Sequence, residues 1–385
     1  MYSLGGYGDM IADRVRVDAY TQALRKTVRP GDVVLEIGTG SGVFAVLACQ
    51  LGAARVYAVE PDPVIQVARE IAAANDCAGS IEFIEDLSTR VTLPVQAGVI
   101  VSDLRGVLPL FQHHLPSIAD ARRRFLAPGG TLIPKRDAVW VAVAEAPEEY
   151  GRIVDCWETN ALGQNLSPAR RLVVNDMRKV RFTPQQLLTP PLLWTTLDYA
   201  TIEHPDVRGA MNFSVQRPGT GHGIVAWFET CLADGICFSN APGLPEAVYG
   251  SMFFPWTEPV PLSEGQKLCV NLEATLLEND YIWRWNTQID SADGSGSALR
   301  FEQSQLSGAV LSLAKLRQSA SDYVPQLAED GRLHRRALEL MDGKNSLEAI
   351  SRRLAAEFPQ RFTRWQQALS YAGKLSQSYS RESSL

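Results

Sequence analysis

Cysteine is scarce in this chain of 385 residues, and no two cysteines form a CxxC pair. The six cysteines are Cys49, Cys77, Cys156, Cys231, Cys237 and Cys269. Structural zinc sites place their cysteines in closely spaced pairs, so we expect no metal site. Sparse, unpaired cysteines are typical of reduced, buried thiols in a cytoplasmic protein.

Long apolar runs are also missing. No segment approaches the roughly 18 consecutive apolar residues that a membrane-spanning helix needs. The N-terminal sequence MYSLGGYGDMIADRVRV lacks the apolar core of a signal peptide. We therefore expect a cytoplasmic protein that does not span a membrane.

Charge is unevenly distributed along the chain. The whole sequence carries 37 basic and 43 acidic residues, a formal charge of −6. Residues 331–385 hold ten Lys and Arg and five Asp and Glu, whereas residues 1–330 hold 27 and 38. The favoured explanation of the basic tail is a solvated helical face. Binding of nucleic acid by this tail is a less favoured alternative.

Strand and helix patterns alternate in the first third of the chain. Apolar strand patterns at 33–38, 55–62, 80–86 and 97–104 are interleaved with helical patterns at 42–53, 63–76 and 113–126, and 127–134 enters a fifth strand. This order predicts an α/β fold with a doubly wound, Rossmann-like domain over 1–134.

Residues 135–310 have a different character. Strand patterns at 138–146, 223–232, 267–277 and 281–289 are separated by Pro- and Gly-rich turns, which predicts an antiparallel β-barrel or sandwich. Its core is expected to contain an aromatic cluster of Phe253, Phe254, Trp256, Trp283 and Trp285. Residues 331–385 return to amphipathic helices, interrupted at Gly343 and Pro359.

A glycine-rich turn follows the first strand. Gly38, Gly40 and Gly42 are spaced GxGxG, and such glycines let a ligand approach the backbone closely. Glu60 ends the second strand, where a carboxylate accepts hydrogen bonds from both hydroxyls of a ribose. Ligands bind at the carboxyl ends of parallel strands, so the turn and the acid together predict an adenosine pocket.

These residues resemble the class I S-adenosylmethionine-dependent methyltransferases, and more narrowly the protein arginine methyltransferase family. The resemblance also covers the helix around Met10 and Arg16, the loop that begins at Ser102-Asp103, and the segment LAPGGTLIP at 126–134. It extends over roughly residues 1–290 and includes the order of the domains.

The resemblance implies S-adenosylmethionine as cofactor and assigns its contacts. Arg16 pairs with the carboxylate of the cofactor, Met10 packs against the adenosine or sulfonium region, and Glu60 holds the ribose. Gly38, Gly40 and Gly42 supply the backbone cradle. The adenine contacts fall on Leu87 and Ser88, followed by Thr89 where the family has an acid.

The acceptor loop departs from the family pattern. Relatives grip a guanidinium with two glutamates, and the matching positions here are Asp103 and Gln112. Asp103 is the predicted substrate-side acid, and Gln112 is neutral. Arg105 adds a positive charge that disfavours a cationic acceptor. His113 and His114 are candidate bases, although a structural role is favoured for an adjacent pair that opens a helix.

Two segments suggest partners. Residues 151–172 resemble the family's helical arm, with Trp157, Leu162 and Leu166 exposed for a partner, so we expect a homodimer. The tail at 331–385 resembles a PqqD-like or winged-helix fold, and PqqD-like domains hold leader peptides.

The favoured function is methylation of nitrogen in a peptide or a small amino-acid-like metabolite, including a role in natural-product biosynthesis. Divergent protein arginine methylation is the alternative, and a non-catalytic cofactor-binding scaffold is the second alternative.

Overall fold

The computed structural model describes residues 3–291 and 298–380, which divide into two compact units. Unit 1 comprises Met1–Val310 and unit 2 comprises Leu311–Leu385. Among the described residues, no helix has both the length and the apolar character that crossing a membrane requires.

Unit 1 begins with two helices, α1 (Leu4–Ala12) and α2 (Arg14–Thr27). Asp13 ends the first helix and caps the second, because its side chain accepts a hydrogen bond from the backbone N–H of Arg16. One side of α2 is buried, including Arg16 and Tyr20. The cap therefore fixes where Arg16 enters the interior.

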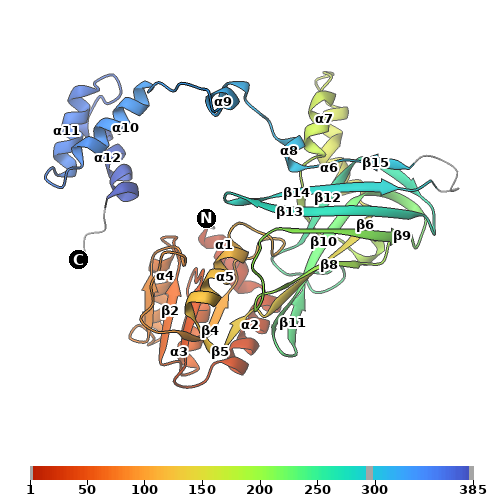
Figure 1. Ribbon diagram of the computed structural model, residues 1–385, viewed down its shortest axis with the longest axis horizontal. Helices are drawn as coiled ribbons and strands as arrows, with labels where there is room; N and C mark the ends of the chain where they lie inside the picture. The colour runs from red at the N-terminus through yellow and green to blue at the C-terminus, as the bar shows by residue number, and fades with distance from the viewer. Residues whose placement is uncertain (1–2, 292–297, 381–385) are drawn as a thin grey trace. The chain divides into compact units, whose positions relative to one another are not determined.

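A five-stranded parallel sheet follows, in the order β3-β2-β1-β4-β5. Its strands are β1 (Val33–Ile37), β2 (Arg55–Val59), β3 (Ile81–Ile84), β4 (Ala97–Ser102) and β5 (Leu126–Ile133). Its helices are α3 (Val43–Gln50), α4 (Ile65–Ala74) and α5 (His114–Phe125) (Figure 1). The predicted doubly wound fold is confirmed, and the strand order reverses between β1 and β4, which is where such sheets bind ligands.

Two antiparallel sheets complete unit 1. One has the order β7-β12-β10-β6-β8 with β11 beside β10, and the other has the order β15-β14-β13-β9. The strands of the first are β6 (Arg136–Ala144), β7 (Arg178–Val180), β8 (Leu192–Asp198), β10 (Gly219–Ala233), β11 (Ile236–Ser239) and β12 (Ser251–Leu262). Those of the second are β9 (Val207–Ser214), β13 (Lys267–Leu277), β14 (Asp280–Ile289) and β15 (Leu299–Phe301).

Four residues of the predicted aromatic cluster belong to the main core of unit 1, whereas Phe253, on the opposite face of β12, packs in a second cluster with residues of α6 (Pro147–Glu158). Phe253, Phe254, Trp256, Trp283 and Trp285 are all fully or almost fully buried. The Phe254 ring lies 5.2 Å from the Trp283 ring, and the Trp285 indole donates to the carbonyl of Pro255. Because each aromatic side chain buries a large apolar area, these residues contribute substantially to the hydrophobic stabilisation of the β domain.

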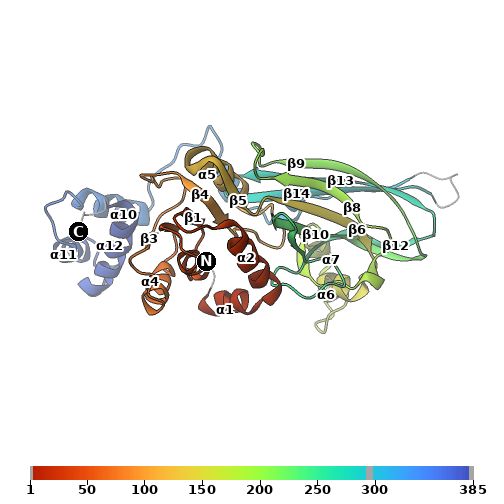
Figure 2. The same cartoon turned by 90° about the horizontal axis from the view of Figure 1, so that it is seen from below.

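The segment predicted as an arm consists of α6 (Pro147–Glu158) and α7 (Ser167–Val173). Both helices protrude beyond the strands (Figures 1 and 2). Leu162, between them, is 74% exposed, whereas Trp157 and Leu166 are half-buried. Leu162 is therefore the apolar side chain that the segment offers most fully to a partner.

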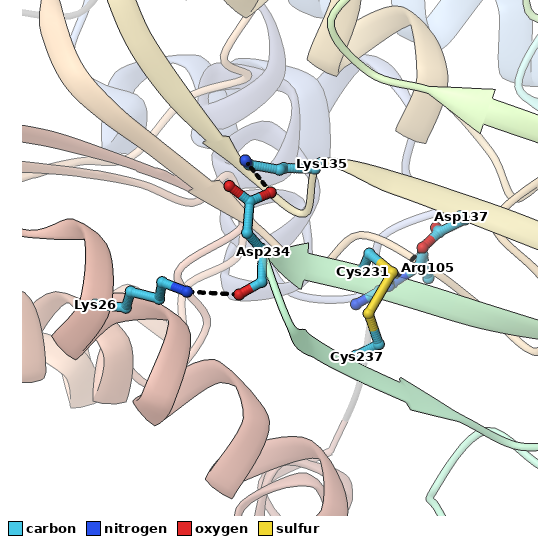
Figure 3. Close-up of a disulfide and its surroundings, with 7 residues drawn as sticks. All are labelled: Lys26, Arg105, Lys135, Asp137, Cys231, Asp234 and Cys237. Atoms are coloured by element: carbon cyan, nitrogen blue, oxygen red, sulfur yellow. Dashed lines mark hydrogen bonds and ion pairs between the residues drawn. A yellow bond between two sulfur atoms is a disulfide. The ribbon is translucent and has the colours of Figure 1, made fainter.

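The expectation that all six cysteines are reduced is wrong for one pair. Cys231 and Cys237 form a disulfide across the β10–β11 hairpin, where they stand directly opposite one another. The turn of the same hairpin is anchored twice: Lys26 of α2 donates to the backbone oxygen of Asp234, and Lys135 pairs with its carboxylate (Figure 3).

Unit 2 consists of the helices α9 (Leu313–Gln318), α10 (Glu329–Leu340), α11 (Leu347–Glu357) and α12 (Trp365–Tyr379), and α8 (Gln305–Gly308) ends unit 1. Its core contains Leu333, Ala337, Leu340, Ile350, Leu354, Phe362, Ala368, Ala372 and Leu375. Residues 311–380 contain no strand, so the PqqD-like or winged-helix resemblance depends on helices alone and stays a prediction.

Candidate active site

A cavity of about 740 Å³ lies at the point where the strand order of the parallel sheet reverses. Its walls come from α1, from the loops after β1, β2, β3 and β4, and from the β domain near Tyr249. All the residues predicted to touch the cofactor or the acceptor line it, with the exception of Gly42. The structure therefore brings these predicted residues together in one cavity.

The three glycines have left-handed backbone conformations, with φ of +71° at Gly38, +53° at Gly40 and +79° at Gly42. A Cβ on Gly38 would lie 2.3 Å from the side chain of Leu104, and a Cβ on Gly40 would lie 2.5 Å from the ring of Tyr7. A Cβ on Gly42 would meet Ala68 of α4 instead. The first two glycines thus shape the cavity, and Gly42 allows α3 and α4 to pack.

Glu60 ties the first two loops together. One carboxylate oxygen accepts from the backbone N–H of Gly40 at 2.9 Å, and the other accepts from that of Asp62 at 3.0 Å. Burial raises the pKa of Glu60, and these two backbone hydrogen bonds oppose the shift. The carboxylate is thereby held against the glycine turn, in a position suited to hydroxyl groups.

Glu36 is a buried acid that the sequence prediction missed. It is the fourth residue of β1, two residues before Gly38, and Thr39 donates a hydrogen bond to it. Burial raises its pKa to about 8, and the Thr39 hydrogen bond and the Arg16 charge only partly offset this. An acid placed shortly before a glycine turn is a local signal that could have identified it.

Arg16 enters the cavity from α2. Its Nε donates to the Asp103 carboxylate at 2.5 Å, and its Nη1 donates to the backbone oxygen of Met10 at 3.2 Å. Among residues 3–291 and 298–380, no acceptor is paired with its Nη2. These remaining N–H groups fit the carboxylate of an amino-acid-like ligand.

The five remaining predicted residues also line the cavity. Met10 is half-buried and Leu87 is 44% exposed, whereas Ser88 is buried. Gln112 is exposed and has a left-handed φ of +42°. His113 is exposed, and its Nε2 lies 2.9 Å from Asn279 of the β13–β14 turn.

His114 is buried instead. Its Nε2 lies 2.9 Å from the Tyr199 hydroxyl, and that hydroxyl donates to Asp137. A hydroxyl has one proton to give, so His114 must be the donor in its own bond to Tyr199. Burial lowers the pKa of His114 to about 3, with the Arg105 charge acting in the same direction. His114 is therefore a neutral histidine in a structural position, which is the role that the sequence favoured for this adjacent pair.

Around the predicted acid Asp103 lies a buried polar cluster, which we call the acceptor-loop cluster. It consists of Arg16, Tyr20, Asp103, Arg105, His114, Asp137, Tyr199 and Tyr249. Asp137 and Tyr199 belong to the β domain and carry no local sequence signal. In the part of the chain that the structure describes, no group of three or more His, Cys, Asp or Glu is arranged to hold a metal ion.

Two family models match consecutive parts of the chain. The model of ribosomal protein L11 methyltransferase (PrmA) matches residues 19–134, and that of the arginine methyltransferase oligomerization subdomain matches residues 135–288. The boundary between them falls between β5 and β6, where the parallel sheet gives way to the antiparallel ones.

Individual relatives agree with these models. Protein arginine N-methyltransferase 6 of Xenopus laevis is 30% identical over 57% of this chain and 68% of its own length. Probable protein arginine N-methyltransferase 6 of Arabidopsis thaliana is 27% identical, and the match spans 54% of that protein. The fold is similar to the enzyme-prozyme complex of Trypanosoma brucei PRMT1 with AdoHcy, with a TM-score of 0.71, 18% identity, and coverage of 78% of this chain and 98% of that one.

Proposed function

The chain belongs to the protein arginine methyltransferase family, and from this membership we propose that it methylates a nitrogen atom of a peptide or protein acceptor. It is an S-adenosylmethionine-dependent methyltransferase. The observation that carries the proposal is the single cavity that joins the glycine turn and Glu60 to the loop from Ser102 to His114. No observation favours a small metabolite or a natural product as acceptor.

The residues of the cavity fit S-adenosylmethionine. The free N–H groups of Arg16 would hold its carboxylate, and Glu60 would accept from its ribose hydroxyls. Gly38 and Gly40 leave room for it against the backbone, and Leu87 and Ser88 lie at the expected adenine end. When bound, the cofactor supplies a methyl group activated by a sulfonium; the chain's own residues hold and orient the two reactants and exclude water.

Mass spectrometry of a peptide library incubated with methyl-labelled S-adenosylmethionine tests the proposal. We expect an added labelled methyl group on specific peptides with the wild-type chain, and none with a Glu60→Ala variant. Cofactor binding without transfer to any peptide or protein would instead favour the scaffold alternative.

Arginine methylation is the second candidate, favoured by family membership. Peptides that differ only at the acceptor residue, with Arg, Lys, His or Gln at that position, separate it from the methylation of other nitrogen groups.

Cofactor affinity should depend on pH through Glu36. Because its raised pKa of about 8 keeps the free protein's acid neutral at lower pH, binding of a cationic cofactor should release a proton. We expect the Kd for S-adenosylmethionine to fall as pH rises from 6 to 8, by up to about tenfold per pH unit, and to level off above about 8. Calorimetry in buffers of different ionisation enthalpy measures both effects.

A Glu36→Gln variant is the matched control, since an amide keeps the shape of the side chain but does not titrate. Its Kd should not vary over the same pH range. A wild-type Kd that is constant between pH 6 and 8.5 would contradict the assignment to Glu36.

We also propose that the arm of α6 and α7 forms a homodimer. The proposal is supported by the match of the oligomerization subdomain model and by the exposure of Leu162. Leu162→Glu should convert the dimer to a monomer in light scattering, because a charge would be buried without a partner. Leu277→Glu is the matched control and should remain dimeric, because Leu277 is 58% exposed at the end of β13. A dimer that persists in the Leu162 variant would rule out this contact.

A further inference from the structure

The Asp103 carboxylate is completely occupied by groups of the chain itself. One oxygen accepts from Arg105 Nε at 3.1 Å and Arg105 Nη2 at 3.0 Å. The other accepts from Arg16 Nε at 2.5 Å and the Tyr249 hydroxyl at 2.7 Å. A carboxylate has about four acceptor positions, so none is left for a donor that enters the cavity.

Arg105 is buried, and both of its terminal nitrogen atoms donate hydrogen bonds within the chain. Its side chain is 0% exposed, Nη1 donates to Asp137 at 3.1 Å, and Nη2 donates to the Tyr20 hydroxyl. Four aromatic rings surround its central carbon, with centroids at 5.3–5.8 Å: Tyr20, Phe228, Phe238 and Tyr249. Two carboxylates and several aromatic faces are the surroundings that suit a desolvated guanidinium.

The β10–β11 hairpin keeps this arrangement closed. Phe228 lies on β10 and Phe238 on β11, and the Cys231–Cys237 disulfide joins the two strands (Figure 3). Arg105 therefore cannot leave Asp103 without opening the aromatic surround as well as losing its hydrogen bonds.

We propose that Arg105 is a resident guanidinium, which occupies the acid of the acceptor loop so that the acceptor entering the cavity is an uncharged nitrogen group. This inference rests on the proposed methyltransferase function and names its class of substrate. Arg16, Arg105, Asp103 and Asp137 carry two positive and two negative charges, so the acceptor end of the cavity is balanced without a substrate cation.

The other carboxylates that line the cavity do not restore a cation site at that end. Glu36 is on β1, and Glu60 and Asp62 follow β2, at the end where the cofactor is expected. Gln112, at the second acidic position of the family pattern, is neutral. A guanidinium brought to the Asp103 loop would lose its hydration and find no free carboxylate in exchange.

Two peptides that differ only in the end group of one side chain test this inference. One carries arginine, and the other carries citrulline, which has the same length but an uncharged urea in place of the guanidinium. Binding to the full chain saturated with S-adenosylhomocysteine is measured by calorimetry. We expect the citrulline peptide to bind at least as tightly as the arginine peptide. Arginine binding ten times tighter or more would overturn the inference.

Variants that free Asp103 provide the second arm. Arg105→Leu opens two acceptor positions and should raise the affinity for the arginine peptide relative to citrulline by about tenfold or more. Tyr249→Phe keeps the aromatic ring and frees one acceptor position on Asp103. It should raise the affinity for the arginine peptide relative to the citrulline peptide a few-fold. If Arg105→Leu does not fold, Tyr249→Phe alone decides the matter. An unchanged ratio in the folded variants would overturn the inference.

The outcomes also separate this inference from the proposed function. Failure of the wild-type chain to bind S-adenosylhomocysteine would count against the methyltransferase function itself. Methylation of the arginine peptide by the wild-type chain, in preference to uncharged acceptors, would leave that function intact and overturn only the role of Arg105.

Discussion

Glu60→Ala is expected to raise the Kd for S-adenosylmethionine by about 10²–10³. Each hydrogen bond between an ionised group and a hydroxyl contributes roughly 1.5–3 kcal/mol, and a ribose presents two hydroxyls. The change also removes the acceptor of the Gly40 N–H, which lies 2.9 Å from the Glu60 carboxylate. Loss of this contact should loosen the glycine turn, so the backbone contacts to the cofactor should weaken together with the ribose contacts.

Calorimetric titration with S-adenosylmethionine measures the effect. Glu85→Ala is a suitable control, because Glu85 is exposed just after the neighbouring strand β3 and does not line the cavity. The Kd of Glu85→Ala should match that of the wild type. The Kd of Glu60→Gln should lie between those of the wild type and Glu60→Ala. A change of less than about threefold in Glu60→Ala would mean that the ribose binds elsewhere.

The cofactor end of the site could be predicted from sequence because its signals are local. The strand β1, the glycines that follow it and Glu60 at the end of β2 lie within 30 residues of one another. Parallel strands bring their carboxyl ends to one edge, so the spacing along the chain determines the spacing in the fold. The position of Glu60 beside the glycine turn could therefore be predicted from spacing, whereas the role of Arg16 was implied by the family resemblance.

The acceptor end could not be predicted in the same way. The sequence shows Arg105 as an added positive charge, but its partner Asp137 lies 32 residues away on β6. Tyr199, which donates to Asp137, lies 94 residues from Arg105, directly after β8. The packing of the β domain sets the register of these two strands. No pattern in the sequence indicates that all the acceptor positions of Asp103 are occupied by groups of the chain. Whether a charge faces a ligand or a second chain segment is a tertiary property.

The missed disulfide had a signal of intermediate strength. Cys231 and Cys237 flank Asp234-Gly235, and Asp-Gly is a strong turn sequence between two strands. A regular two-residue turn here would place Cys231 opposite Phe238, and the irregularity between Cys231 and Ala233 shifts the register by one residue, so that Cys231 lies opposite Cys237. The strand prediction ended at residue 232, so the returning strand and its pairing with Cys231 were not recognised.

The β domain thus contributes to the site through buried charge as well as through shape. Asp137 is fully buried at the start of β6, and it is the acceptor of both Arg105 Nη1 and the Tyr199 hydroxyl. It connects the first antiparallel sheet to the loop that follows β4. The stability of unit 1 and the position of Arg105 should therefore depend on the same carboxylate.

Asp137→Ala is expected to lower the free energy of unfolding by about 3–5 kcal/mol, since it leaves the Arg105 guanidinium buried with one carboxylate fewer and removes the proton acceptor of Tyr199. Chemical denaturation of the full chain measures the change. Asp198→Ala is the control. Asp198, on β8, lies opposite Arg136 of β6 and is therefore close to Asp137 in the same pair of strands, but its side chain is exposed. The free energy of unfolding of Asp198→Ala should stay close to that of the wild type.

The double variant Arg105→Leu/Asp137→Leu distinguishes a lost attraction from an unpaired charge. Replacing both partners of a buried ion pair by apolar groups of similar size is often nearly neutral, whereas removing one is costly. The double variant should therefore be more stable than Asp137→Ala, although Asp103 loses two of its donors. A double variant as unstable as the sum of the single ones would show that the two residues act independently, and Arg105 would then be held by Asp103 and the aromatic rings alone.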